Sequence, residues 1–494
     1  MVGGARLDTR APVEPAPLPL PSPLLLKGRV RALGIGFLLL FSSYIAVQYL
    51  QTSLNGAVGY YCNLSAYLSF ALASIVAPYF VARSSSLGLL LGVSASFYIA
   101  NMLWNIWPDP AGPYIASCSV VGVSAGTLWV GQATFVARAA AAAALASGEA
   151  LTDATSRLNG IFFFAFQASG CFGTVFSGVL LLTLTGPGAR TLLFALLSAM
   201  GTLGMLLLCL LVEPGEAEGK ILALPLGCSS SSSSVGRAHV PTAAAAPADS
   251  SPSAFIRFLL SSRRLCLLLP LFFAMGSFQA IGFATLTGAL AAPILGVSIV
   301  PFLGTAYYAA ASLVMYPSTA LALQPRIGRR WVLAVVGALW VGCVGGMLAW
   351  VGAFPSAAAA PKAAAYPVLF LFAIVLGCGD SVFTSFVSAT LQNWFPSDST
   401  FAFAAMRSGM ALGTAVFCGI GPNFSEQTLF VALIVISSLA AALLLFVHLR
   451  DVDIDARTLE GGLAPAPPAD HREEGQGGAA VLPGKENTST GATS

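Results

Sequence analysis

The sequence predicts an all-α membrane protein with twelve transmembrane helices in two six-helix pseudo-repeats, from its composition, its charge placement and its apolar runs. Of the 494 residues, 56% are hydrophobic and 9% are charged, whereas roughly 25% charged residues are usual in a soluble domain. Of the 23 basic and 20 acidic residues, 28 lie in three short segments, 1–31, 213–264 and 449–494. The rest of the chain carries only 15 charges, too few to solvate two soluble domains. A cytosolic enzyme is therefore excluded, and a bilayer location is expected.

Twelve stretches of the sequence are long enough to cross a membrane, because a spanning helix needs roughly 20 apolar residues. Each stretch is bounded by charged residues, Pro or Gly. The runs are continuously apolar, as in Gly34–Leu40, and lack the alternation of membrane β-strands. The expected spans are 33–54, 59–82, 87–106, 113–137, 157–184 and 190–212 in the first half, and 265–290, 298–323, 331–353, 365–392, 399–421 and 427–448 in the second.

The basic residues predict the orientation of these spans. With the N-terminus in the cytoplasm, 21 of the 23 basic residues lie on or near the inner face, and Arg190 and Lys362 lie outside. Cytoplasmic loops of membrane proteins carry an excess of Lys and Arg. Both termini and the long central loop are therefore expected in the cytoplasm. The sequence does not resolve whether the protein lies in the plasma membrane or in an endomembrane.

Two helical bundles and three polar segments make up the expected domain organisation. The central segment contains the six-serine run Ser229–Ser234 and a Pro/Ala-rich stretch, a composition that cannot bury enough apolar surface to fold. The expected domains are a disordered cytoplasmic N-terminal tail (1–31), a first six-helix bundle (32–212), a disordered cytoplasmic linker (213–263), a second six-helix bundle (264–448) and a disordered cytoplasmic C-terminal tail (449–494).

Two charged residues lie well inside the expected spans and away from their ends, where a charge is costly unless it faces protein or water. Asp380 lies roughly 18 Å from the cytoplasmic end of its span, near the midplane. Arg407 lies about 12 Å into the next span from the same side, and its long side chain could reach Asp380. The pair is expected either to relay protons or ions, or to form a structural ion pair that joins two helices.

A further group of polar residues recurs at helical spacing in the first-half spans. Gln48, Gln51 and Asn55 follow intervals of three and four, which places them on one helix face. Such residues turn away from lipid, so they either line a central cavity or hydrogen-bond between helices. The candidates are Gln48, Gln51, Asn55, Asn101, Trp129, Gln132, Asn159 and Gln167.

Two glycine pairs predict close contact between helices. They are Gly122-x-x-x-Gly126 in the fourth span and Gly409-x-x-x-Gly413 in the eleventh. Glycine leaves no side chain between two backbones, so membrane helices can approach closely at such a pair. The pairs are expected at seams within the molecule.

Several classes of site are not expected. The net charge of +3 comes from scattered basic residues, which gives no surface for nucleic acid. His239, His448 and His471 fall in a loop, at a helix end and in a tail, so no histidine acid–base site or zinc site can form in the spans. The nine cysteines include no C-x-x-C pair and are expected to be small packing residues. No catalytic residue, metal or cofactor is predicted.

One cytoplasmic turn is similar to the loop signature of the major facilitator superfamily. It is the run Arg326-Ile327-Gly328-Arg329-Arg330 after the eighth span. The first-half turn Arg83-Ser84-Ser85-Ser86 has lost most of that signature, and Pro325 stands where the superfamily has an acid. The resemblance implies the superfamily's fold, whose two six-helix halves match the number of spans, with Arg326, Gly328, Arg329 and Arg330 as the loop signature.

Several strings in the spans resemble those of a narrower group, the uncoordinated-ninety-three (Unc-93-like) family. Arg407 is basic where the family usually has a Lys, and Thr384 lies near a position where it has an Asn. These similarities are spread over most of residues 31–448. The strings are Gln48–Asn55, Thr127–Gln132, Asn159–Phe163 with Gln167, Gly377–Asp380 and Ala402–Ala404.

This resemblance implies a protein with a transporter's fold that acts by binding other membrane proteins. Some family members regulate potassium channels, and vertebrate ones escort Toll-like receptors from the endoplasmic reticulum. The expected function is therefore to regulate or escort an ion channel, or another membrane protein, within the lipid bilayer. The alternative, argued from the residues, is a secondary transporter of a small solute or ion that is proton-coupled through Asp380.

The predicted orientation can be tested with epitope tags. Tags placed at the N-terminus, within Ser229–Ser234 and at the C-terminus are all expected to bind antibody only after the membrane is permeabilised, because all three segments are predicted to be cytoplasmic. Immunofluorescence of intact and permeabilised cells measures this. A linker tag and a terminal tag on opposite sides of the membrane would contradict the predicted topology.

Overall fold

The computed structural model describes residues 22–184, 186, 188–211, 250–322, 328–356, 358–395 and 398–441, and every regular element within these ranges is helical. The first half contains α1 (Pro23–Asn55), α2 (Ala57–Arg83), α3 (Leu87–Trp104), α4 (Ala111–Ser147), α5 (Leu151–Thr183) and α6 (Ala189–Cys209). The second contains α7 (Pro252–Ser261), α8 (Arg263–Ala280), η3 (Ile281–Ala291), α9 (Ala292–Leu295), η4 (Val297–Ile299), α10 (Val300–Ala322), α11 (Gly328–Ala353), α12 (Lys362–Trp394), α13 (Ser399–Ile420), η5 (Gly421–Asn423) and a last helix, Glu426–Ala441.

Eleven of the described helices are long and apolar enough to cross a membrane. In this count α8, η3 and α9 form one continuous span, Arg263–Leu295. The twelfth expected span, 427–448, corresponds to the shorter apolar helix Glu426–Ala441, and the rest of that span lies outside the described residues. The described elements thus agree with the all-α, twelve-helix architecture that the sequence predicts.

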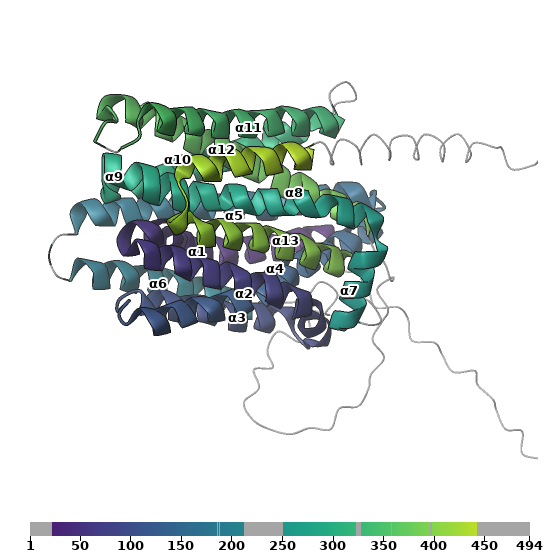
Figure 1. Ribbon diagram of the computed structural model, residues 1–494. Helices are drawn as coiled ribbons and strands as arrows, with labels where there is room; N and C mark the ends of the chain where they lie inside the picture. Colours follow the sequence, from purple (N-terminus) through teal and green to yellow (C-terminus); the bar gives the residue numbers. More distant parts are fainter. Residues whose placement is uncertain are drawn as a thin grey trace, which may run out of the picture. The chain divides into compact units, whose positions relative to one another are not determined.

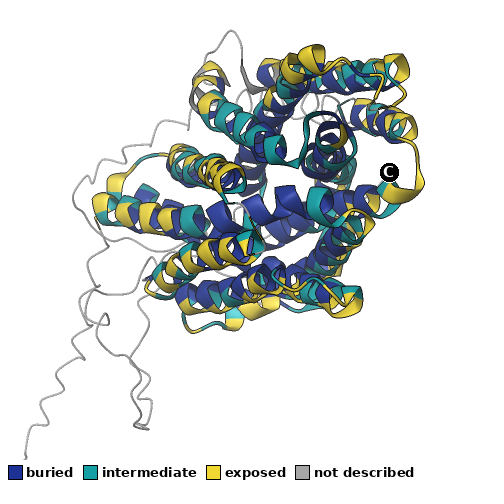
Figure 2. Ribbon diagram, turned by 90° about the vertical axis from the view of Figure 1, so that its left-hand side faces the viewer, coloured by how far each residue is buried: buried dark blue, intermediate teal, exposed yellow. Residues whose placement is uncertain are grey.

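Large apolar side chains face outward from the helices. Leu72 on α2 is 61% exposed, and Leu313 on α10 is 77% exposed. Figure 2 shows buried residues on the inward faces of the helices and exposed residues on the outward faces. A soluble protein rarely leaves so much apolar surface in water, so these outward faces contact lipid. The chain is an integral, multi-pass membrane protein.

The helix contacts repeat between the two halves of the chain. In the first half α2 packs on α4 and α1 packs on α5, while in the second α10 packs on α12 and α8 packs on α13. The halves meet where α2 packs on α13 and α5 packs on α10. Figure 1 shows these helices running side by side. The repeated contacts are those expected of two pseudo-repeats that share one interface.

α1 begins inside the segment expected to be a disordered tail. The Ser22 hydroxyl accepts a hydrogen bond from the N–H of Leu25 at 3.3 Å, and Pro23 follows at the first helical position. Both residue types favour a helix start at these positions. Leu26 and Val30 are fully buried, so packing supports these early turns. The expected tail boundary at residue 31 is corrected accordingly, and residues 1–21 lie outside the described ranges.

α7 lies inside the segment expected to be linker, 213–263. The side chain of Ser251 accepts a hydrogen bond from a backbone N–H one turn further on, and Pro252 begins the helix. Phe255 is buried against Phe401 of α13, with ring centroids 6.0 Å apart. α7 lies across one end of the bundle (Figure 1). Its aromatic contact explains why the end of the linker is helical, while residues 212–249 lie outside the described ranges.

The seventh span changes its helical geometry part of the way along. Residues Ile281–Ala291 form a π-helix between α8 and α9, a form that is rare and usually limited to a single turn. The hydroxyl of Tyr60 on α2 donates a hydrogen bond to the Ala284 carbonyl at 2.9 Å. This bond from another helix satisfies a backbone acceptor within the π-helical segment.

The glycine pairs lie at helix seams, as their spacing predicts. A Cβ added to Gly122 would lie 1.9 Å from the carbonyl oxygen of Ala66, so α4 touches the backbone of α2 there. A Cβ added to Gly413 would lie 2.0 Å from the carbonyl oxygen of Phe273, so α13 touches α8. The two seams occupy the two halves of the chain, and each requires a residue without a side chain.

Replacement of Gly122 with Ala is expected to destabilise the protein by about 1–3 kcal/mol, because the added methyl forces α2 and α4 apart. Thermal unfolding of the purified chain in detergent measures this change. Gly112→Ala in the same helix is the matched control, because no atom lies within 4 Å of its added Cβ. Equal unfolding temperatures for the two variants would contradict the close seam.

Candidate functional site

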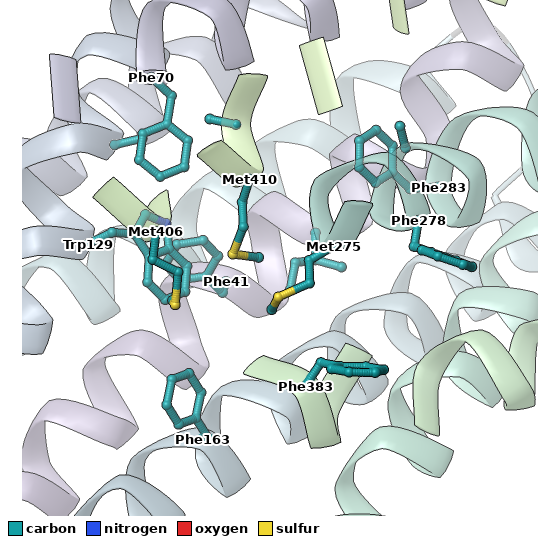
Figure 3. Close-up of a cluster of buried hydrophobic side chains, with 14 of the residues drawn as sticks. Phe41, Phe70, Trp129, Phe163, Met275, Phe278, Phe283, Phe383, Met406 and Met410 are labelled. Carbon is teal, nitrogen blue, oxygen red and sulfur yellow. The ribbon is translucent and has the colours of Figure 1, made fainter. Parts of the chain in front are cut away.

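A cavity of about 90 Å³ lies within the bundle, between helices of both halves of the chain. This volume has room for roughly six to nine water molecules. Apolar residues such as Phe41, Phe166 and Met410 form part of its wall, and Figure 3 shows Phe41 and Met410 within the surrounding core. The polar residues of the wall are Gln48, Gln167, Gln279, Asp380, Thr384 and Arg407, together with six tyrosines.

Asp380 reaches the cavity because two glycines on α12 let neighbouring helices come close. A Cβ on Gly377 would meet the Tyr307 carbonyl oxygen of α10 at 2.1 Å, and a Cβ on Gly379 would meet the Trp340 indole nitrogen of α11 at 1.6 Å. The Asp380 carboxylate accepts a hydrogen bond from Gln279 Nε2 at 2.9 Å. The Gly-x-Gly-Asp string thus sets the packing of α12 and points its acid into the cavity.

Arg407 reaches the cavity from α13 and lies over the ring of Trp129 on α4. The guanidinium carbon is 4.1 Å from the ring centroid. Trp129 is held by Phe41 and Phe166, whose ring centroids are 5.2 and 4.9 Å away, and Figure 3 shows Trp129 beside Phe41. A cation over an indole face is attracted by the ring's quadrupole, most strongly when both are desolvated.

The two charged residues share the cavity without forming an ion pair. Both line its wall and both are more than nine-tenths buried. Among the described residues, Asp380 bonds to the amide of Gln279 and Arg407 packs on the ring of Trp129, and no ion pair links the two charges. In the structure each charge has a neutral neighbour, the Gln279 amide or the Trp129 ring, and whether the pair relays protons or joins the two helices stays a hypothesis.

Three of the eight predicted cavity residues line the cavity, namely Gln48, Trp129 and Gln167. Gln48 Nε2 donates a hydrogen bond to the Tyr67 hydroxyl at 2.6 Å. Gln167 is buried, and its Oε1 has no hydrogen-bond partner among the described residues. Lining the cavity is one of the two alternatives that the sequence leaves open for these residues.

Three other predicted residues belong instead to a hydrogen-bonded cluster between helices. Gln51 and Asn101 both donate to the Cys118 sulfur, at 3.6 and 3.3 Å. The Oδ1 of Asn55 accepts a hydrogen bond from Arg190 Nη2 at 3.2 Å. This cluster joins α1, α3, α4 and α6, so for these residues the interhelical alternative agrees with the structure.

The remaining two candidates lie elsewhere in the bundle. Asn159 Nδ2 donates to Gln392 Oε1 at 2.8 Å, a bond that links α5 to α12 across the two halves. Gln132 is buried in α4 and is not part of the cavity wall. Neither residue faces the cavity.

The sequence did not single out Gln279 or the tyrosines of the wall. Gln279 is an amide in an otherwise apolar span, so the criterion that identified Asp380 would also have found it. Tyr44 precedes Gln48 by four residues and therefore shares its helix face. Tyr44 and Tyr98 meet edge to face, with centroids 4.6 Å apart. The six tyrosines are Tyr44, Tyr49, Tyr67, Tyr98, Tyr307 and Tyr308.

The structure describes only part of the predicted cytoplasmic loop signature. Arg326 lies outside the described residues, and Gly328, Arg329 and Arg330 form the first turn of α11. In the corresponding first-half turn, Arg83 donates to the Ser250 hydroxyl at 3.1 Å, next to the start of α7. Within the described part of the chain, no cluster of three His, Cys, Asp or Glu residues could hold a metal ion.

Comparison with known proteins relates the chain to one family. A family model described as "Ion channel regulatory protein UNC-93" matches residues 51–286. UNC93-like protein 3 of Arabidopsis thaliana is 27% identical over 414 residues, which cover 82% of each chain. Protein unc-93 homolog A of Bos taurus is 26% identical over 454 residues, 84% of this chain and 91% of its own length. The "Putative potassium channel regulatory protein unc-93" of Caenorhabditis elegans is 26% identical over 145 residues, 29% of this chain and 20% of its own length.

Solved structures relate the chain to one fold. The xylose transporter XylE from E. coli, in a partially occluded inward open conformation, has a TM-score of 0.55 and 14% identity, over 85% of this chain and 95% of that one. The E. coli fucose:proton symporter FucP has a TM-score of 0.56 and 12% identity, over 86% and 99% of the two chains. Identity this low shows the fold alone, and that fold is the transporter fold of the major facilitator superfamily.

Replacement of Trp129 with Leu is expected to destabilise the protein more than replacement with Phe, because Phe keeps a ring face for the buried Arg407 guanidinium. The difference should be about 2 kcal/mol, measured by thermal unfolding in detergent. In an Arg407→Met background the gap between the two variants should narrow, since the cation is gone and only the ring contacts with Phe41 and Phe166 still favour Phe. A gap of unchanged size in that background would show that the cation–π contact contributes nothing.

Proposed function

We propose that this chain is a member of the UNC-93 family and a non-enzymatic membrane protein that regulates or escorts an ion channel. The observation that carries the proposal is the match of residues 51–286 to the family model described as an ion channel regulatory protein. The fold supports a membrane role but does not choose between regulation and transport, because one fold hosts many functions. The name of the nematode relative is the reason for proposing a potassium channel as partner.

The surface that meets the channel is proposed to lie on the lipid-facing helices or in the loops. A channel subunit in the same bilayer can touch only residues that are open to lipid or water. Asp380 is 5% exposed and Arg407 is 7% exposed, so the cavity cannot contact another chain directly. Regulation of a channel should therefore tolerate changes in the cavity that leave the fold intact.

Both termini and the linker between the two six-helix bundles are proposed to lie in the cytoplasm. The placement of basic residues supports the orientation. In this orientation α7 and the Arg83–Ser250 contact lie at the cytoplasmic end. A cytoplasmic partner or a regulatory enzyme would reach the molecule there.

A second candidate function is secondary transport of a small solute, with Asp380 carrying the coupling proton. The observation that favours it is the position of a buried carboxyl in a cavity between the two halves. Transporters of this fold bind solutes at that interface. The name and description of the relatives favour regulation, so this candidate stands second.

Channel regulation can be tested with a potassium channel subunit recovered by proximity labelling and crosslinking from cells that express the tagged chain. Co-expression is expected to change the current of that channel, and Asp380→Asn is expected to change it equally, because the contact surface lies outside the cavity. Whole-cell recording measures the current. Failure to recover any channel subunit, or an unchanged current, would count against the regulator.

Transport can be tested by flux into liposomes that contain the purified chain, under a pH or potassium gradient. If Asp380 couples protons to a solute, Asp380→Asn abolishes flux while surface expression in cells is unchanged. The regulator proposal expects no Asp380-dependent flux. Reproducible flux that requires Asp380 would therefore replace regulation by transport as the leading function.

A further inference from the structure

Three buried polar atoms at the cavity have no hydrogen-bond partner among the described residues. They are Arg407 Nε, Gln167 Oε1 and Thr384 Oγ1, and their residues all line the cavity wall. Buried polar atoms are almost always hydrogen-bonded, to protein or to something held in the site. The three atoms include a charged donor, an acceptor and a hydroxyl that can do both. A polar guest with both donors and acceptors would give all three atoms a partner.

The two charged residues of the cavity wall indicate which charges the bound molecule should carry. Asp380 and Arg407 line the same cavity, but each has only a neutral partner within hydrogen-bonding or ring-stacking distance. Two buried charges of opposite sign that are not paired carry a large desolvation penalty. A guest with one negative and one positive group would offset both penalties at once, whereas an ion of one sign would offset only one.

The aromatic part of the wall suits the positive end of such a guest. Tyr49, Tyr307 and Tyr308 line the cavity together with Asp380, and the Tyr307 and Tyr308 rings are 5.0 Å apart. Aromatic faces attract ammonium groups and are the usual recognition surface for quaternary ammonium ligands. At the other charge, the Trp129 ring fixes the Arg407 guanidinium, whose unpartnered Nε can donate to a carboxylate.

We propose that the cavity is a binding site for a small zwitterion, a molecule with one carboxylate and one ammonium group. Its carboxylate contacts Arg407 and its ammonium group contacts Asp380 and the tyrosines. A volume of about 90 Å³ limits the guest to roughly the size of six to nine waters, which is the size of an amino acid or a betaine. Binding of this guest goes beyond channel regulation and does not require that the guest be transported.

The test uses three probes of nearly the same shape and different charge. Glycine betaine carries both charges, 3,3-dimethylbutyrate carries only the negative charge, and choline carries only the positive charge. Affinity for the purified full chain in detergent is measured by calorimetry and by the rise of the unfolding temperature with probe concentration. Glycine betaine is expected to bind at least about tenfold more tightly than either probe of single charge.

Charge-removing variants then test which residue contacts which end. In Asp380→Asn, glycine betaine and 3,3-dimethylbutyrate are expected to bind about equally, because the site for the positive end is lost. In Arg407→Gln, glycine betaine and choline are expected to bind about equally. Ser381→Ala is the matched control, because its hydroxyl contacts Met315 at 3.9 Å and not the cavity, and it should bind like the wild type.

Several results would overturn the proposal. They are no binding of glycine betaine by the wild type, equal binding of all three probes, or an unchanged preference in both charge-removing variants. If those variants do not fold, Asp380→Glu and Arg407→Lys keep the charges, and they must keep the preference for glycine betaine. None of these measurements involves a channel, so the zwitterion site and the proposed regulation can fail separately.

Discussion

Hydrocarbon offers no hydrogen bonds, so the buried polar groups of this bundle can find partners only inside the protein or in a molecule that it binds. This requirement decides which helices touch at their polar positions. Asp380 on α12 accepts a hydrogen bond from the amide of Gln279 on α8. Arg407 on α13 makes a cation–π contact with the ring of Trp129 on α4. The second of these contacts, like the bond from Asn159 on α5 to α12, crosses between the two halves. Polar residues such as Arg407 and Asn159 therefore also contribute contacts between the two halves.

Most of the fold could be predicted from the sequence, because lipid imposes a length and a composition on each span. The spans were found by these two properties alone, and their ends moved by several residues. The start of α1 and the whole of α7 could not be predicted in this way. Their stability comes from tertiary contacts, such as the burial of Phe255 against Phe401, and such contacts leave no periodic signal in a Pro- and Ser-rich segment.

The candidate site could be predicted in part. An ionisable residue in an apolar span must face protein or water, and the structure places both Asp380 and Arg407 in the cavity wall. Helix periodicity gives the face of a residue but neither its depth nor its partner, so Gln51 was grouped with Gln48 although the two bond to different helices. The tyrosines were missed because their rings are ordinary in a membrane protein, and only the fold reveals that six of them surround one space.

The π-helical segment Ile281–Ala291 sets the register of the seventh span. A π-turn closes its hydrogen bond over five residues where an α-turn closes it over four, so each conversion between the two forms rotates the residues beyond it and shifts them along the axis. Phe283 lies within this segment and in the cavity wall. A local winding or unwinding of one helix would thus change the shape of the chamber without any hinge and without separation of the two halves.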